Sequence, residues 1–228
     1  MTNKTVVRGR RLAPWAGFTF MLTKLRRFGS RALSCCRSWI QAFRRHSLEE
    51  KDIHITMGKL FYGSQTGTTT GVARKIRKHL NGLISEVKSI QYAQPHELAA
   101  CDFLVLGGAT YGDGELTDDW KRFWPLMDSI SFAGKRVALF ALGDQFGYSY
   151  TFASGMKQLY DKVSDSGGQV IADCIPTADF EFTQSESLVD GYFIGLVIDE
   201  VNQPELTEKR IRAWASIVRQ QLALACTA

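Results

Sequence analysis

Apolar runs and amphipathic stretches alternate along the chain from Met57 onward. The runs "GKLFYGS" (58–64), "DFLVLGGA" (102–109) and "RVALFALG" (136–143) predict buried strands, because continuous apolar runs of this length are typical of parallel strands covered on both faces. The segment "LISEVKSIQ" (83–91) mixes apolar and polar residues, which predicts a half-exposed strand.

Helical periodicity fills the segments between and after these strands. It predicts a helix from about Thr69 to Leu80, with Val72, Ala73 and Ile76 on its inner face. Further helices are predicted over Thr117–Met127, Thr151–Ser164 and Thr207–Leu222. Strands that alternate with helices form right-handed βαβ units. The pattern therefore predicts one α/β domain over residues 57–228, a doubly wound parallel sheet with helices on both faces.

Three loops follow the first, third and fourth apolar strands, at residues 63–69, 109–116 and 143–150. In an open parallel sheet, ligands bind beyond the carboxyl ends of the strands, where the strand order reverses. We therefore expect the three loops to lie together and to form the binding site.

The first of these loops, "GSQTGTTTG" (63–71), is rich in glycines and hydroxyl groups. A Walker-type loop would place a lysine after its glycines to reach a β/γ-phosphate. Here the first basic residue is Arg74, inside the predicted helix. Hydroxyl and backbone N–H donors at a helix N-terminus favour an anion. The loop therefore predicts a site for a single terminal phosphate.

Aromatic side chains stand in the other two loops. "ATYGDGEL" (109–116) contains Tyr111, and "GDQFGYSY" (143–150) contains Tyr148 together with Asp144. Two exposed aromatics beside a phosphate loop can sandwich a flat ring, which an anion alone would not need. The three loops together predict a ligand that combines a phosphate with a planar ring system.

The residues that carry this prediction resemble those of the flavodoxin family. "SQTGTT" has the family's Ser/Thr-x-Thr-Gly-x-Thr phosphate pattern. The resemblance continues through "ATYGDGELTDDW" and "ALFALGDQFGYSYTFASGMKQLYDKV", and it includes a segment, from "ADFEFTQ" to "EKRIRAW", that is similar to the inserted loop and final helix of long-chain flavodoxins. It covers residues 57–222 and none of residues 1–56. It implies a five-stranded flavodoxin-like sheet of order 2-1-3-4-5.

The resemblance also implies FMN as the cofactor. By position, the first loop would hold the phosphate, Tyr148 and Tyr111 would stack on the two faces of the isoalloxazine, and Asp144 with backbone groups of the later loops would face its pyrimidine edge. The chain departs from the family at Tyr111, where many members have Trp, and at Ala109, where Pro is usual. The implied cofactor-binding residues are Ser64, Gln65, Thr66, Gly67, Thr68, Thr69, Ala109, Thr110, Tyr111, Gly112, Asp113, Gly114, Leu142, Gly143, Asp144, Phe146 and Tyr148.

The expected function is that of a low-potential one-electron carrier with no substrate of its own. The cofactor supplies the redox chemistry and the protein sets its potentials. Gly112 can adopt backbone conformations closed to other residues, so its carbonyl can turn toward the flavin N5 when that nitrogen is protonated. The acids Asp113, Glu115, Asp118, Asp119 and Asp144 would oppose a second negative charge on the ring.

Other classes of protein share parts of this pattern. An FMN-dependent NAD(P)H:quinone reductase is an enzyme of similar fold, and it is the main alternative. The FMN module of a diflavin reductase would require a second reductase half, which does not follow. A phospho-receiver domain would need an acidic pair after the first strand, which is absent. A flavin sensor or a purely structural FMN-binding module stays open.

Charge divides the chain into two parts. Residues 1–56 hold 12 Lys and Arg against three acids, whereas residues 57–228 hold 16 against 20. Within the second part, residues 101–200 carry 16 acids and six bases, which argues against nucleic acid and for a basic partner. We expect a monomer that docks basic redox proteins such as a ferredoxin/flavodoxin-NADP reductase.

The basic leader, residues 1–56, has three interpretations. Leu25, Phe28, Trp39 and Phe43 recur at helical spacing among arginines, which suits an organelle transit peptide or a membrane-surface helix. Translation could also start at Met57, with the leader as upstream reading frame or a disordered tail. The protein is expected in the cytoplasm without the leader and in an organelle if the leader is a transit peptide. Membrane contact is not expected outside the leader.

The cysteines and histidines predict no metal site or disulfide framework. The five cysteines include no C-x-x-C pair, and the four histidines show no ligand spacing. A reducing compartment is the simpler interpretation.

Overall fold

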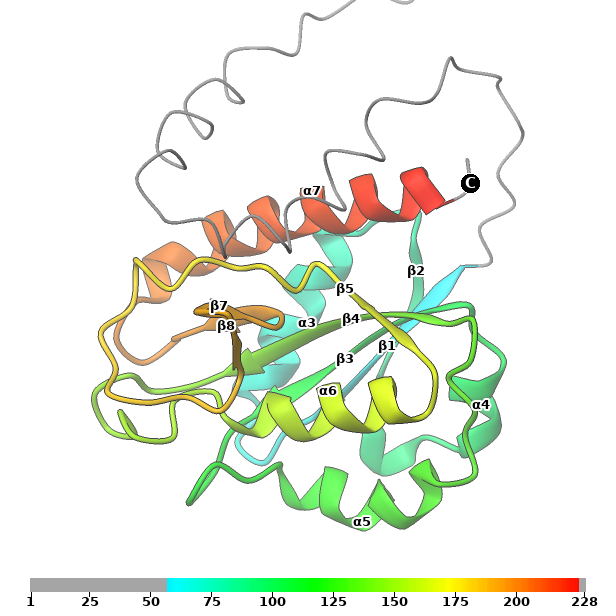
Figure 1. The fold of residues 1–228 in the computed structure, drawn as a ribbon, viewed down its shortest axis with the longest axis horizontal. Coiled ribbons are helices and arrows are strands. Elements are labelled where there is room, and N and C mark those ends of the chain that lie inside the picture. Colours follow the sequence, from blue (N-terminus) through cyan, green and yellow to red (C-terminus); the bar gives the residue numbers. More distant parts are fainter. Residues whose placement is uncertain (1–56, 226–228) are drawn as a thin grey trace, which may run out of the picture. The chain divides into compact units, whose positions relative to one another are not determined.

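The computed structural model describes residues 57–225, and the interpretations of residues 1–56 concern a segment outside the described residues. A parallel sheet forms the centre of the described domain (Figure 1). Its strand order, β2-β1-β3-β4-β5, confirms the predicted topology. These strands are β1 (Gly58–Gly63), β2 (Ile84–Ser89), β3 (Phe103–Ala109), β4 (Arg136–Leu142) and β5 (Gln169–Ile171).

The fifth position of the sheet is occupied by two separate segments. The first half of β4 pairs with β5, while its second half pairs in parallel with β8 (Leu196–Ile198). Residues 172–195 are therefore inserted into the last strand, as the resemblance to long-chain flavodoxins implies. The insertion contains a short antiparallel pair, β6 (Leu188–Val189) and β7 (Tyr192–Phe193).

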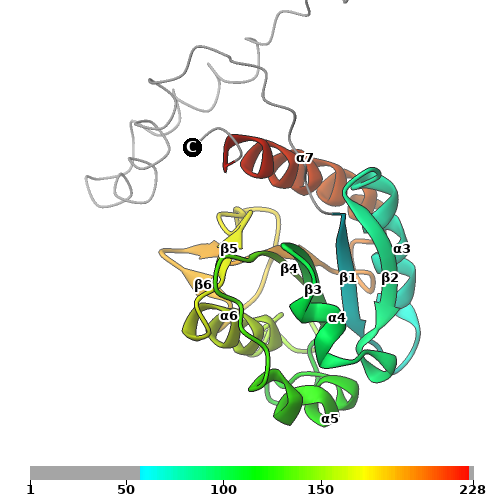
Figure 2. The ribbon, with the colours of Figure 1, turned by 90° about the vertical axis from the view of Figure 1, so that its right-hand side faces the viewer.

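Helices cover both faces of the sheet (Figure 2). One layer consists of α3 (Thr68–His79) and α7 (Thr207–Ala225), which pack on a core around Phe140 and Trp214. The other layer consists of α5 (Asp118–Met127) and α6 (Gly155–Asp165), on a core around Trp120 and Phe152. Both cores are built from strand residues that are buried on alternate faces, which explains the continuous apolar runs.

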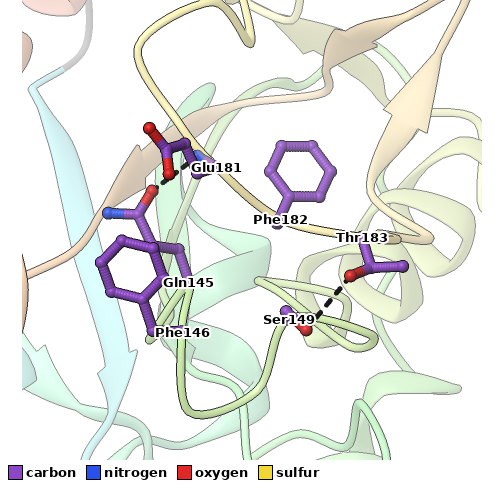
Figure 3. A pocket seen from close by; sticks show the side chains of 6 residues that line it. All are labelled: Gln145, Phe146, Ser149, Glu181, Phe182 and Thr183. Carbon is purple, nitrogen blue, oxygen red and sulfur yellow. Dashed lines mark hydrogen bonds between the residues drawn. The ribbon is translucent and has the colours of Figure 1, made fainter.

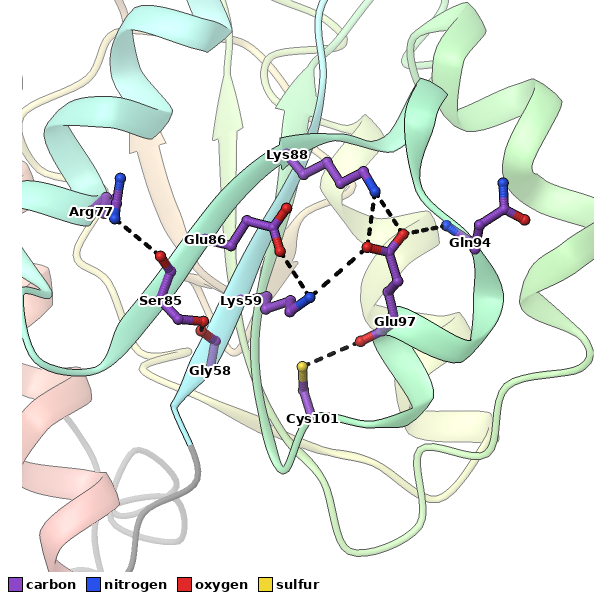
Figure 4. A network of polar contacts seen from close by, with 9 residues as sticks. All are labelled: Gly58, Lys59, Arg77, Ser85, Glu86, Lys88, Gln94, Glu97 and Cys101. Atoms are coloured by element: carbon purple, nitrogen blue, oxygen red, sulfur yellow. Dashed lines mark hydrogen bonds and ion pairs between the residues drawn. The ribbon is translucent and has the colours of Figure 1, made fainter.

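Two local features differ from the sequence-based prediction. Helix α6 begins at Gly155 rather than Thr151, because the intervening residues form turns and Ala153 has a left-handed φ of 55° that a helix cannot contain. Helix α4 (Pro95–Ala99) was not predicted. Its first turn is closed by Glu97, whose carboxylate accepts from Gln94 N–H at 2.8 Å and from Lys88 (Figure 4). The hydrogen bond from Lys88 lowers the pKa of Glu97.

Candidate functional site

The three predicted loops lie at one edge of the sheet. Strands β1, β3 and β4 are parallel neighbours, and Gly63 is in register with Gly108, as Ala109 is with Leu142. The second and third loops are also joined directly, since the N–H of Thr110 donates to the Leu142 carbonyl at 3.0 Å. The structure therefore brings the predicted site residues of all three loops together at the carboxyl edge.

The first loop leads into α3 with an uncapped helix N-terminus. Gly67 is the N-cap residue, its φ is 88°, and no side chain accepts from the first N–H groups of the helix. The first turn of α3 contains no acidic residue. The hydroxyl groups of Ser64, Thr66 and Thr68 stand around this end, with the Ser64 Oγ 3.1 Å from the Gly67 nitrogen. Free N–H groups and hydroxyls without a competing carboxylate form an anion site.

Helix α5 holds the start of this loop in place. Ser64 N–H donates to the Asp119 carboxylate at 3.2 Å, and that buried carboxylate is also paired with Arg122 at 2.6 Å. A Cβ on Gly63 would lie 2.0 Å from the Thr117 hydroxyl, so only glycine allows α5 to approach this strand end. Asp119 was expected at the surface near the flavin, whereas it is buried, paired with Arg122 and bonded to the start of the phosphate loop.

The second loop forms a closed turn between Tyr111 and Glu115. Their backbones exchange hydrogen bonds of 2.9 and 2.8 Å, which makes this segment a small antiparallel bridge. Gly112 sits at the tip with a left-handed φ of 50°, a conformation that glycine adopts without cost. Its carbonyl accepts from the Thr151 hydroxyl at 3.4 Å. This single long bond is the contact that a rotation of the Gly112 peptide would break.

The third loop is ordered by its own aspartate. The Asp144 carboxylate accepts from Gly147 N–H at 2.8 Å, from Phe146 N–H at 3.2 Å and from the Asn202 side chain at 2.8 Å. These donors, Gly147 first, lower the pKa of Asp144 below its ordinary value. The geometry thus gives Asp144 a role in shaping the loop, which the sequence did not indicate.

A second acid, Asp199, supports the same loop from behind. It is fully buried at the end of β8 and accepts from the N–H groups of Gln145, Val201 and Asn202 at 3.1, 3.0 and 2.9 Å. Sequence analysis missed this residue. The sequence contained one signal for it, since Asp199 ends the apolar run "GLVID". A carboxylate that is buried at the end of a strand requires several hydrogen-bond donors.

The loop aromatics are exposed to different degrees. Tyr148 is 55% exposed and Tyr111 is half-buried, so both leave ring area for a ligand. Phe146 is 62% exposed and lines a hollow of about 380 Å³ against Phe182 of the inserted segment (Figure 3). The structure therefore places Phe146 beside the insertion. Gln145 fastens that segment by accepting from Glu181 N–H at 2.7 Å.

The acids near these loops are less uniform than the sequence suggests. Glu115 is paired with Lys121, and Asp119 with Arg122. Asp113 and Asp118 are exposed and form no ion pair with a described residue. Among the described residues, the loop-edge acids that form no ion pair are therefore Asp113, Asp118 and the half-buried Asp144. Among residues 57–225, no cluster of His, Cys, Asp or Glu has the arrangement of a metal site.

The carboxyl edge of this doubly wound sheet carries an uncapped helix N-terminus and two tyrosines with accessible ring area. These are the features of an α/β nucleotide-binding protein. Within that class, the chain belongs to the flavodoxin family. The flavodoxin family model matches residues 60–214, which include all three loops and the insertion.

Known proteins agree with this assignment over the same part of the chain. The chain is 39% identical to a flavodoxin of Synechococcus elongatus over 166 residues, which are 72% of this chain and 97% of that protein. It is 37% identical to flavodoxin 1 of Escherichia coli, over 72% of this chain and 94% of that protein. The crystal structure of Fusobacterium nucleatum flavodoxin bound to flavin mononucleotide is 32% identical, with a TM-score of 0.69 and coverage of 72% and 98%.

Proposed function

We propose that this protein carries electrons one at a time on a bound FMN and converts no substrate of its own. The observation that carries the proposal is the open N-terminus of α3, where Gly67 leaves the first N–H groups without a side-chain acceptor. The solved structure of a related flavodoxin contains FMN. The phosphate of FMN fits such a terminus, because it offers several acceptors to donors that are otherwise unsatisfied.

The residues of the first loop would hold the phosphate. The Ser64, Thr66 and Thr68 hydroxyls would donate to it together with the first N–H groups of α3, and Gln65, Gly67 and Thr69 would shape the loop. The loop contains no lysine or arginine, so binding relies on hydrogen bonds and the helix dipole. This donor set suits a single phosphate group.

The second and third loops would hold the ring. Tyr148 and Tyr111 would stack on its two faces, and the backbone of the segments 109–114 and 142–144 would meet its edge. FMN supplies the redox chemistry, and the protein determines which oxidation state of the flavin is favoured. The Gly112 carbonyl would accept a hydrogen bond from the protonated flavin N5, after the peptide rotates away from the Thr151 hydroxyl.

Electron partners would dock at the loop edge. We propose basic redox proteins, such as a ferredoxin/flavodoxin-NADP reductase, because Asp113 and Asp118 present unpaired negative charge beside the ring site. The protein would act as a monomer. None of the helices in residues 57–225 has the length and apolar character that a membrane crossing requires.

The compartment depends on residues 1–56. The proposed domain, residues 57–228, acts in the cytoplasm if translation starts at Met57 and in an organelle if the leader is a transit peptide. N-terminal sequencing of the protein from its own cells distinguishes the two.

A stepwise reductive titration tests the proposed function. The protein reconstituted with FMN should take up electrons in two separated one-electron steps, with a distinct absorption spectrum after the first. It should not oxidise NAD(P)H with a quinone as acceptor. A single two-electron step together with steady quinone turnover would identify the protein as a quinone reductase instead.

A further inference from the structure

Charge is distributed very unevenly between two helices and the rest of the domain. Helices α3 and α7 together carry eight of the 16 Lys and Arg residues of residues 57–228 and one of its 20 acids, Glu208. Their net charge is therefore +7, against −11 for the remainder of the domain. The two helices pack beside each other on the same face of the sheet (Figure 2).

Six of these eight basic side chains form an exposed surface, which we call the basic face. None of the six forms an ion pair with another residue in the part of the chain that the structure describes. The basic face consists of Arg74, Arg77, Lys78, Lys209, Arg212 and Arg219. The other two point to different partners: Lys75 pairs with Glu200 at 3.1 Å, and Arg210 stacks on Phe180 at 3.9 Å.

The basic face is continuous across the two helices. Arg219 of α7 donates to the carbonyls of His79 and Asn81, at 3.0 and 2.7 Å, and so lies over the end of α3. His79 in turn contacts Glu208 of α7 at 2.6 Å. Carbonyl oxygens at a helix C-terminus leave the arginine charge uncompensated by any carboxylate. Arg219 is therefore held at the junction of the two helices and joins their positive charges into one surface.

The face lies away from the proposed flavin edge. Its first residue, Arg74, comes six residues after Thr68, where α3 begins at the phosphate loop. The exposed acids Asp113 and Asp118 belong to the loop edge and to α5, which covers the opposite face of the sheet. A partner on the basic face would thus leave the loop edge open to redox proteins.

The basic leader joins the domain beside this face. The hydroxyl of Ser85 donates to the Gly58 carbonyl at 3.0 Å, and Arg77 donates to the Ser85 carbonyl at 3.0 Å (Figure 4). The first described strand therefore starts next to Arg77. The 56 residues that precede it carry 12 basic side chains against three acids, together with the apolar run "LAPWAGFTFML".

We propose that the basic face of α3 and α7 docks the protein on a membrane surface that contains anionic phospholipids. The phosphate groups of such a surface complement six unpaired cations, and each Lys or Arg near it contributes about 1 kcal/mol. Residues 1–56, which precede the domain in the chain, include apolar residues of the kind that a second, inserting contact needs. Membrane contact by the domain was not predicted from the sequence, because the face exists only once α3 and α7 are packed together.

Nucleic acid and acidic proteins are the competing occupants. No aromatic residue is exposed on α3 or α7, so the face lacks the stacking groups that single-stranded nucleic acid uses. The net charge of −11 over the rest of the domain also opposes a polyanion that extends beyond the face. A lipid surface would contact the basic face and not the acidic remainder of the domain. It therefore avoids the repulsion between that remainder and a polyanion.

Binding of the full chain to lipid vesicles tests the proposal. Phosphatidylcholine vesicles with and without phosphatidylglycerol are sedimented with the parent protein and with Arg74→Gln/Arg212→Gln, two side chains of the face for which no hydrogen bond competes. The matched control is Lys157→Gln/Lys162→Gln on α6, which removes the same charge from the other face of the domain. Unchanged FMN affinity of both double variants verifies that they are folded.

The parent should bind only vesicles that contain phosphatidylglycerol, and more weakly as salt rises. The Arg74→Gln/Arg212→Gln variant should bind about thirtyfold more weakly, and the control should stay within about twofold of the parent. Equal weakening in both variants, or no vesicle binding by the parent, would overturn the proposal. Tighter binding to a DNA duplex than to vesicles, lost in the arginine variant, would assign the face to nucleic acid instead.

Discussion

The first and third loops of the site differ in whether their backbone N–H donors already have side-chain acceptors. In the phosphate loop, residues 63–69, the helix N-terminus is left without a side-chain cap, and its hydroxyls surround the open end. In the ring loop, residues 143–150, the N–H groups of Gln145, Phe146 and Gly147 already donate to the carboxylates of Asp144 and Asp199. The phosphate loop leaves the first N–H groups of α3 without a side-chain acceptor, whereas three N–H groups of the ring loop already have one.

This difference separates two tasks. A phosphate is bound by donors that stay unsatisfied until it arrives, so its loop must be open. A flat ring is bound by stacking on a rigid aromatic, so its loop must be ordered before binding, which reduces the entropy lost on association. Variants in the ring loop should therefore affect the fold and the ring, whereas variants in the phosphate loop should affect phosphate binding alone.

Asp199→Asn should produce the largest effect, and on stability. The amide would place a donor against the N–H groups of Gln145, Val201 and Asn202 in a fully buried site. We expect a loss of about 3 kcal/mol in the free energy of unfolding. Urea denaturation measures it, with Glu186→Gln of the inserted segment as the exposed control. A loss no larger than that of the control would show that the ring loop is ordered without Asp199.

Tyr148→Ala should have the next largest effect, and on FMN affinity. It removes an exposed ring that would be buried against the isoalloxazine, so both apolar contact and stacking are lost. We expect FMN to bind about 2.5 kcal/mol more weakly, with flavin fluorescence partly restored. Tyr150→Ala, two residues along and 69% exposed, is the matched control. Equal affinity of Tyr148→Ala and the control would place the ring elsewhere.

Thr66→Val probes the open loop and should weaken FMN binding by about 2 kcal/mol. Valine keeps the shape of threonine but removes a donor to a charged group. Stability in urea without FMN should stay near that of the parent, because Thr66 is exposed and its hydroxyl contacts only Thr68. Fluorescence titration measures the affinity, with Thr177→Val as a distant control. A stability loss without a loss in affinity would reverse the roles of the two loops.

Gly112→Val should have the smallest effect, about 1 kcal/mol on the spacing of the two reduction potentials. A Cβ at Gly112 would meet only the Glu115 carboxylate, at 4.0 Å, so the constraint comes from the left-handed φ and from hindered rotation of the peptide. Gly112→Asn is the matched variant, because asparagine tolerates this φ. Redox titration should show the potentials closer together in the valine variant. Unchanged spacing would mean that the Gly112 carbonyl does not control the second electron.

Sequence patterns predicted the sheet and the three loops because those depend on local periodicity. Continuous apolar runs revealed β1, β3 and β4, and the hydroxyl-rich segment revealed the phosphate loop. The supporting residues were not predictable in the same way. Asp119 and Asp199 are bound to partners 55 and 54 positions away in the sequence, so local periodicity could not identify those partners.

The basic face illustrates the same limit at a larger scale. Its residues come from helices separated by more than a hundred positions, and the chain average hides them among the acids. Composition by sequence segment detected the acidic half and the basic leader. It could not detect that the domain's own bases gather on one side, because that requires the packing of α3 against α7.

Comparison of FMN with riboflavin, which has the same ring and no phosphate, tests the division of tasks most directly. Both ligands are titrated onto the parent, Thr66→Val and Tyr148→Ala. The account predicts that Thr66→Val weakens FMN and leaves riboflavin unchanged, whereas Tyr148→Ala weakens both by the same factor. If Thr66→Val weakened riboflavin as much as FMN, or if Tyr148→Ala weakened FMN alone, the assignment of phosphate and ring to these two loops would be wrong.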